Sequence, residues 1–169
     1  MICYIRSKIW YFQDFMVYLK IESNKKANMR RGSKEKLKHL IYSSRPVHFD
    51  ATVVDGILTS SKANNKKSGV TGALIYRQDL YLQFLEGPED QVDQTYRKII
   101  KDRRHRDLKK LRDASNNRRL FSSWAMRGDP VETSMWSYEE VKNGLLTRLS
   151  SQEALYVFEK LSRNVDQFN

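Results

Sequence analysis

Short runs of apolar residues between positions 37 and 127 alternate with polar or breaker residues, and these runs predict strands. The clearest run covers residues 80–86 and stops at Gly87-Pro88. Its length and its leucine and aromatic content are typical of a buried strand. Further strands are expected over residues 37–44, 70–76, 110–115 and 120–127.

Helical spacing occurs in two places between these strands. Asp50 is suited to cap a helix whose apolar positions fall on one side, at Val53, Val54, Ile57 and Leu58. Residues 64–68 are polar and predict a loop. Pro88 fits the first turn of a second helix, with apolar positions at Val92, Tyr96, Ile99 and Ile100.

The resulting order, β-α-β-β-α-β-β, predicts the α+β class. It resembles the ferredoxin-like arrangement, a sheet with two helices on one face. Two C-terminal helices are expected beyond Pro130, because capping boxes pair Ser137 with Glu140 and Ser150 with Glu153.

The chain divides by composition into three parts. Residues 1–34 form a basic N-terminal extension that ends in a polar linker, and Met29 is an alternative start. Residues 35–130 form the central domain, and residues 131–169 form a helical cap. At 169 residues the chain fits one domain with a modest core.

The net charge of +11 suggests a nucleic-acid partner, but its distribution weakens that interpretation. Residues 1–34 carry +6, and the remaining residues carry only +5. Residues 97–119 hold eleven basic and three acidic residues, without the interleaved aromatics that single-strand binding requires. A solvated helix end and loop explains that cluster better.

Other patterns exclude several classes of protein. One cysteine permits no intramolecular disulfide, and the three histidines lack metal-ligand spacing. No run of eighteen apolar residues and no secretory signal is present, so we expect a soluble, cytoplasmic protein without a membrane span. There is no G-x-G-x-x-G and no P-loop.

Gln83 is the most informative single residue. Period-two alternation places it with Tyr81 and Leu85 on one face of an apolar strand. A buried primary amide without partners costs about 1–3 kcal/mol, so Gln83 needs a polar partner from the protein or from a ligand. The strand taken alone favours a structural role, with Gln83 bonded to a neighbouring backbone group.

Several other polar or oxidisable residues accompany Gln83 at strand and helix ends, and each taken singly has a packing explanation. Together they resemble the BLUF domain, a blue-light sensor that uses flavin. The matching blocks are LIYSSR at residues 40–45, SKANN at 61–65, GVTG at 69–72, YLQFLEG at 81–87, DRRH at 102–105 and FSSWAM at 121–126. Six blocks in the correct order, covering over half of the chain, make the resemblance specific.

The resemblance implies a role for each matched residue. Tyr42 corresponds to the photoactive tyrosine, Gln83 to the switching glutamine, and Asn65 to the asparagine that bonds the pyrimidine edge of the flavin. Asn64 falls where members carry a flavin-contacting residue. Arg104 and His105 match the pair beside the polar edge of the ring, and Trp124 and Met126 match strand residues that rearrange on illumination.

The resemblance also implies the cofactor and the partners. FAD is favoured, with FMN and riboflavin as open alternatives, and the phosphate tail is expected near the basic residues 103–106. We expect a stand-alone photoreceptor without enzymatic activity, which signals to a downstream protein of unknown identity and forms a homo-oligomer.

Two other functions fit parts of the sequence less well. The first is a nucleic-acid or acidic-partner binding protein of ferredoxin-like fold, but the chain lacks the RNA-recognition motif. The second is a flavin-dependent oxidoreductase, for which neither an open substrate site nor a hydride source is visible.

Overall fold

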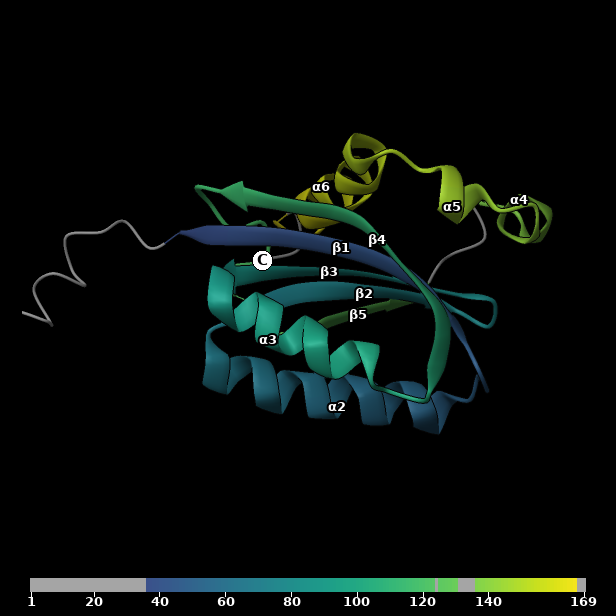
Figure 1. Cartoon of the computed structure of the whole chain (residues 1–169), viewed down its shortest axis with the longest axis horizontal. Coiled ribbons are helices and arrows are strands. Elements are labelled where there is room, and N and C mark those ends of the chain that lie inside the picture. The colour runs from purple at the N-terminus through teal and green to yellow at the C-terminus, as the bar shows by residue number, and fades with distance from the viewer. Residues whose placement is uncertain (1–35, 124, 131–135, 167–169) are drawn as a thin grey trace, which may run out of the picture. The chain divides into compact units, whose positions relative to one another are not determined.

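A computed structural model describes residues 36–123, 125–130 and 136–166. In this part of the chain a five-stranded sheet has the order β4-β1-β3-β2-β5 (Figure 1). The strands are β1 (Leu37–Pro46), β2 (Thr71–Arg77), β3 (Leu80–Pro88), β4 (His105–Asn116) and β5 (Arg127–Pro130). The helices are α2 (Ala51–Ser68), α3 (Glu89–Ile100), α4 (Tyr138–Lys142), α5 (Leu145–Arg148) and α6 (Ser151–Asp166).

The pairing of the strands confirms the predicted ferredoxin-like arrangement. Strand β3 lies between β1 and β2 and is antiparallel to both, while β4 pairs with the other edge of β1. Strand β5 adds to β2 in the parallel direction. Helices α2 and α3 cover one face of the sheet, and α6 lies across the opposite face (Figure 1).

Alternation along the strands divides the core into two layers. Leu82 and Phe84 of β3 pack with Phe158 of α6 on one face. Leu85 packs on the other face with Val54 of α2 and Val92 of α3. Gln83 alternates with Leu82 and Phe84, so its side chain belongs to the layer under α2 and α3.

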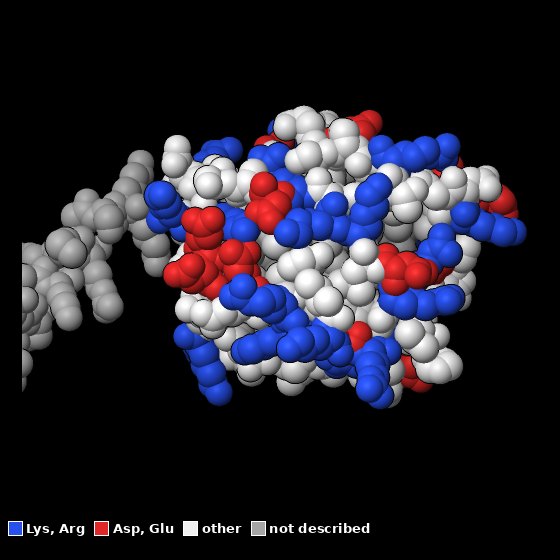
Figure 2. Space-filling model, viewed as in Figure 1, with Lys and Arg blue, Asp and Glu red and all other residues white. Residues whose placement is uncertain are grey.

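Positive and negative side chains both occur on the face of the described residues that is drawn in Figure 2. Figure 2 shows groups of Asp and Glu between the Lys and Arg side chains on the face drawn there. Exposed Lys110, for example, lies 2.7 Å from Asp113.

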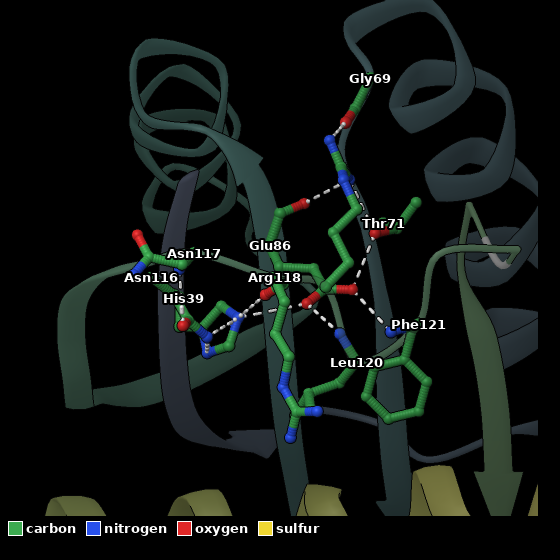
Figure 3. Close-up of polar contacts among 10 residues, drawn as sticks. His39, Gly69, Thr71, Glu86, Asn116, Asn117, Arg118, Leu120 and Phe121 are labelled. Atoms are coloured by element: carbon green, nitrogen blue, oxygen red, sulfur yellow. Dashed lines mark hydrogen bonds and ion pairs between the residues drawn. The ribbon is translucent and has the colours of Figure 1, made fainter. Parts of the chain in front are cut away.

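The predicted strand over residues 120–127 is wrong, because β5 begins only at Arg127. The buried Glu86 explains the difference (Figure 3). Its carboxylate accepts hydrogen bonds from the backbone N–H groups of Leu120 and Phe121, each at 2.7 Å. These two N–H groups therefore bond to a side chain in place of a neighbouring strand.

The predicted loop over residues 64–68 is also wrong, since α2 continues to Ser68. Gly69 ends the helix in the left-handed conformation (φ 66°), and its N–H bonds to the carbonyl of Asn65. Lys66 and Lys67 lie in the last turn, where cations interact favourably with the helix dipole. The polar composition of residues 64–68 suggested a loop, although the helix ends only at Gly69.

Other predicted features are confirmed. Asp50 caps α2 through the N–H of Thr52, and the capping box of Ser137 and Glu140 opens α4. Reciprocal bonds of 2.8 and 3.2 Å join Ser150 and Glu153 at the start of α6. Among the described residues, no helix has the length and apolar character needed to cross a membrane. The predicted extension over residues 1–34 lies outside the described part of the chain.

Candidate functional site

A cavity of about 430 Å³ lies between the sheet and helices α2 and α3. Its floor consists of buried strand residues, and α2 and α3 provide its two walls. The floor residues are Tyr42, Leu74, Tyr81, Gln83 and Leu85. Of the apolar positions of α2, Ile57 lines the cavity, whereas Val53 is not among the lining residues.

Two floor residues, Tyr42 and Gln83, form a chain of three buried side chains with Met126. Tyr42 of β1 and Gln83 of β3 are direct partners in the antiparallel register. The Tyr42 hydroxyl donates a short hydrogen bond to Gln83 Oε1, and Gln83 Nε2 lies 3.5 Å from Met126 Sδ. Direct cross-strand partners have close Cβ atoms, so the register itself brings the phenol and the amide together.

Burial keeps Tyr42 in its neutral form. Only 3% of the residue is exposed, and this burial is the main cause that raises its pKa, with Tyr96 a smaller cause. The Tyr96 ring lies 5.6 Å from the Tyr42 ring between centroids. A neutral phenol retains the proton with which it bonds to Gln83.

Asn64 and Asn65 occupy different parts of the site. Consecutive helical residues point about 100° apart, so only one of the pair can face the sheet. Asn65 is buried, and its Nδ2 donates to the carbonyl of Ala125 at 2.8 Å. Asn64 is exposed and contributes to the rim of the cavity.

Arg104 and His105 also line the cavity. Nε and Nη2 of Arg104 bind the carboxylate of Asp102, and this hydrogen bonding is the main cause that lowers the pKa of Asp102. His105 Nε2 lies 3.0 Å from the carbonyl of Ile99, which can only accept, so this nitrogen donates. His105 Nδ1 lies 2.8 Å from the Ser44 hydroxyl.

The structure thus brings most of the predicted site residues together. Six of them line the cavity, and Met126 reaches it through its contact with Gln83. The six are Tyr42, Asn64, Asn65, Gln83, Arg104 and His105. Trp124 lies outside the described residues.

Sequence reasoning missed other lining residues. Tyr81 was placed on the face of Gln83 but was not recognised as part of the site. The polar residues of α3 that line the cavity were also missed, although their helical spacing marks one face: Gln91, Gln94, Thr95 and Lys98. Exposed Lys67 and Lys98 stand at the rim, on α2 and α3 respectively.

The comparisons with known proteins agree on one family. The family model described as "Sensors of blue-light using FAD", BLUF, matches residues 37–127. A photoactivated adenylate cyclase subunit alpha of Euglena gracilis is 33% identical over 98 residues, which are 57% of this chain and 10% of that protein. The blue light- and temperature-regulated antirepressor BluF of Escherichia coli is 36% identical over 74 residues, 43% of this chain and 18% of that protein.

Solved structures show the same fold. The photo-activated state of BlsA superposes with a TM-score of 0.60 at 27% identity, covering 73% of this chain and 92% of that one. The dark-state structure of the BLUF protein BlrB gives a TM-score of 0.64 at 24% identity, covering 78% and 98%. The two curated relatives are much longer, since this chain spans 10% and 18% of their lengths.

Proposed function

Because the chain belongs to the BLUF family of flavin-binding blue-light sensors, we propose that the cavity between α2 and α3 holds the flavin and that Tyr42 and Gln83 form its light-driven switch. The observation that carries this proposal is the hydrogen bond from the Tyr42 hydroxyl to Gln83 inside that cavity. This bond joins an oxidisable phenol to an amide that can both donate and accept hydrogen bonds.

The residues of the cavity fit a flavin. Ligand sites combine apolar walls with a few placed polar groups, in volumes of about 300–1,000 Å³. Here Ile57, Leu74 and Leu85 supply apolar surface, while Asn65 and Gln83 supply amides for the donors and acceptors of the ring's polar edge. Lys67 and Lys98 are exposed at the rim and suit the anionic phosphates of FAD or FMN.

Light-driven transfer at Tyr42 requires both an electron and a proton to leave the phenol. When bound, the flavin supplies the absorption of blue light and, once excited, a strong one-electron oxidant. Tyr42 would be the donor of the electron, and its proton would leave along the existing hydrogen bond to Gln83 Oε1 while the amide releases a proton from Nε2. Recombination returns both to Tyr42, so no net oxidation remains.

The side-chain amide of Gln83 is the group whose arrangement stays changed after the electron and the proton have returned to Tyr42. In the dark arrangement its Oε1 accepts from Tyr42 and its Nε2 faces Met126 Sδ, which is a weak acceptor. Rotation of the amide would turn Nε2 toward the Tyr42 oxygen and Oε1 toward Met126, so the Tyr42–Gln83 hydrogen bond would reverse its direction. Tautomerisation would likewise make Oε1 a donor. Two arrangements of similar free energy are what a switch requires.

The output passes to a partner protein through the segment between β4 and β5. Met126 contacts Gln83, and Phe121 in the same segment packs edge-on against Phe158 of α6, with ring centroids 6.4 Å apart. Rearrangement at Gln83 thus shifts the packing of α6, on which Tyr156 is 58% exposed. We propose that the chain acts as a sensor through such a partner and not as an enzyme.

Absorption spectroscopy tests the proposal. Purified protein loaded with FAD should bind it non-covalently, and blue light should shift its absorption to the red without bleaching, with thermal recovery. Gln83→Ala should keep the flavin but lose the red shift. A flavin-loaded Gln83→Ala protein with the normal shift would show that another residue is the switch.

A further inference from the structure

Tyr81 carries a buried hydroxyl without a hydrogen-bond partner. The residue is 3% exposed, and its Oη is one of only two fully buried side-chain polar atoms without a partner among the described residues. The other is Nε of Arg112, which is not among the residues of the cavity. Most buried polar side-chain atoms are paired, so an unpaired one needs an explanation.

The position of Tyr81 supplies that explanation. It lines the cavity, on the same face of β3 as Gln83 and about 7 Å along the strand. Arg104 and Asp102 line the cavity with it, and both act electrostatically on the Tyr81 phenol, whose pKa burial raises. The hydroxyl is therefore held as a neutral donor at the Arg104 end of the cavity.

We propose that Tyr81 is a further flavin-binding residue, whose hydroxyl donates a hydrogen bond to a carbonyl oxygen of the isoalloxazine ring. A ring carbonyl is the appropriate acceptor because Tyr81 belongs to the buried floor with Gln83, whereas the exposed rim is suited to the phosphate tail. The inference rests on the proposed binding of flavin in this cavity. It concerns a residue outside the Tyr42–Gln83 switch.

The Tyr81→Phe variant tests this assignment, since it removes only the hydroxyl. Tyr76→Phe is a matched control, because Tyr76 lies directly opposite Tyr81 on β2, packs against the same core layer, and is not among the residues that line the cavity. Equilibrium titration with FAD gives the dissociation constants, and urea unfolding of the flavin-free proteins measures stability independently.

We expect Tyr81→Phe to weaken FAD binding about tenfold, equivalent to about 1.4 kcal/mol, while Tyr76→Phe changes it less than about twofold. Flavin-free Tyr81→Phe should be at least as stable as the wild type, because no protein partner loses a bond and an unpaired buried hydroxyl is removed. The loss should be equal for lumiflavin, which lacks the ribityl and phosphate tail. The infrared carbonyl bands of the dark, flavin-loaded protein should shift in Tyr81→Phe alone.

Three results would overturn the assignment. Unchanged FAD affinity in Tyr81→Phe would show that the hydroxyl has no flavin partner. A loss that appears with FAD but not with lumiflavin would place the acceptor in the tail. Equal losses in both tyrosine variants would indicate general disturbance of the core. Failure of the wild type to bind any flavin would instead refute the proposed function itself.

Discussion

Glu86→Gln tests whether one buried carboxylate holds the segment that completes the site. Glu86 has no exposed surface, and both of its oxygens are used (Figure 3). Oε1 accepts from the N–H of Phe121 at 2.7 Å and from the Thr71 hydroxyl at 3.0 Å. Oε2 accepts from the N–H of Leu120 at 2.7 Å and lies 3.3 Å from His39 Nε2.

Glutamine has nearly the same shape but replaces one oxygen with an NH₂ group. In either orientation of the amide, a donor then faces a backbone N–H donor. One charged-acceptor bond to a backbone N–H is lost, worth about 1.5–3 kcal/mol, and the facing N–H is left unsatisfied. The other N–H bond loses its charge assistance. We therefore expect Glu86→Gln to lower the free energy of unfolding by about 3 kcal/mol.

Urea unfolding, followed by far-ultraviolet circular dichroism, measures this change as a lower transition midpoint. Glu89→Gln provides the control, because Glu89 is exposed in the first turn of α3. This substitution should change the free energy of unfolding by no more than about 0.5 kcal/mol. Hydrogen exchange should also rise at the amides of Leu120 and Phe121. A stability loss below about 1 kcal/mol in Glu86→Gln would refute the reasoning.

Three further predictions concern pH, packing and binding. Burial raises the pKa of Tyr42 above its ordinary 10.0. The neutral phenol therefore contributes fully to the free energy of unfolding below pH 10, and this contribution is lost as the pH rises above 10. In urea titrations between pH 10 and 12, wild-type stability should fall more steeply than that of Tyr42→Phe, by up to about 1.4 kcal/mol per pH unit. Gly72→Ala should cost about 3 kcal/mol in urea unfolding, because its Cβ would lie 2.0 Å from the carbonyl oxygen of Phe84. Gly56→Ala, with open space around the Cβ, should stabilise α2 by about 0.5–1 kcal/mol. Asn65→Ala should weaken FAD binding in titrations more than Asn64→Ala does, and the reverse order would contradict their assigned places.

The local sequence pattern predicted the helices and strands whose backbone hydrogen bonds stay within the helices and the sheet. Alternation along residues 80–86 placed Gln83 in one layer, and capping signals located the N-terminal starts of α2 and α4. The contact of Gln83 with Tyr42 depends on the register of β1 and β3, which lie about 40 residues apart and which no local pattern sets. For this pair, the family resemblance supplied what periodicity did not.

The errors have physical causes that act over long distances in the sequence. Residues 120–127 contain apolar residues at strand-like spacing, but Glu86, more than 30 residues earlier, takes the N–H groups that a strand would use. The unpaired hydroxyl of Tyr81 is equally invisible in sequence, because only the packed structure shows which polar atoms lack partners.

The central claim is that Tyr42 drives the switch through Gln83, and the light-minus-dark absorption spectrum of flavin-loaded Tyr42→Phe tests it most directly. Phenylalanine fills the same space but has no hydroxyl to release an electron and a proton. The account predicts normal folding and flavin content with no red-shifted state after blue light. A red shift of wild-type size and recovery in Tyr42→Phe would contradict it.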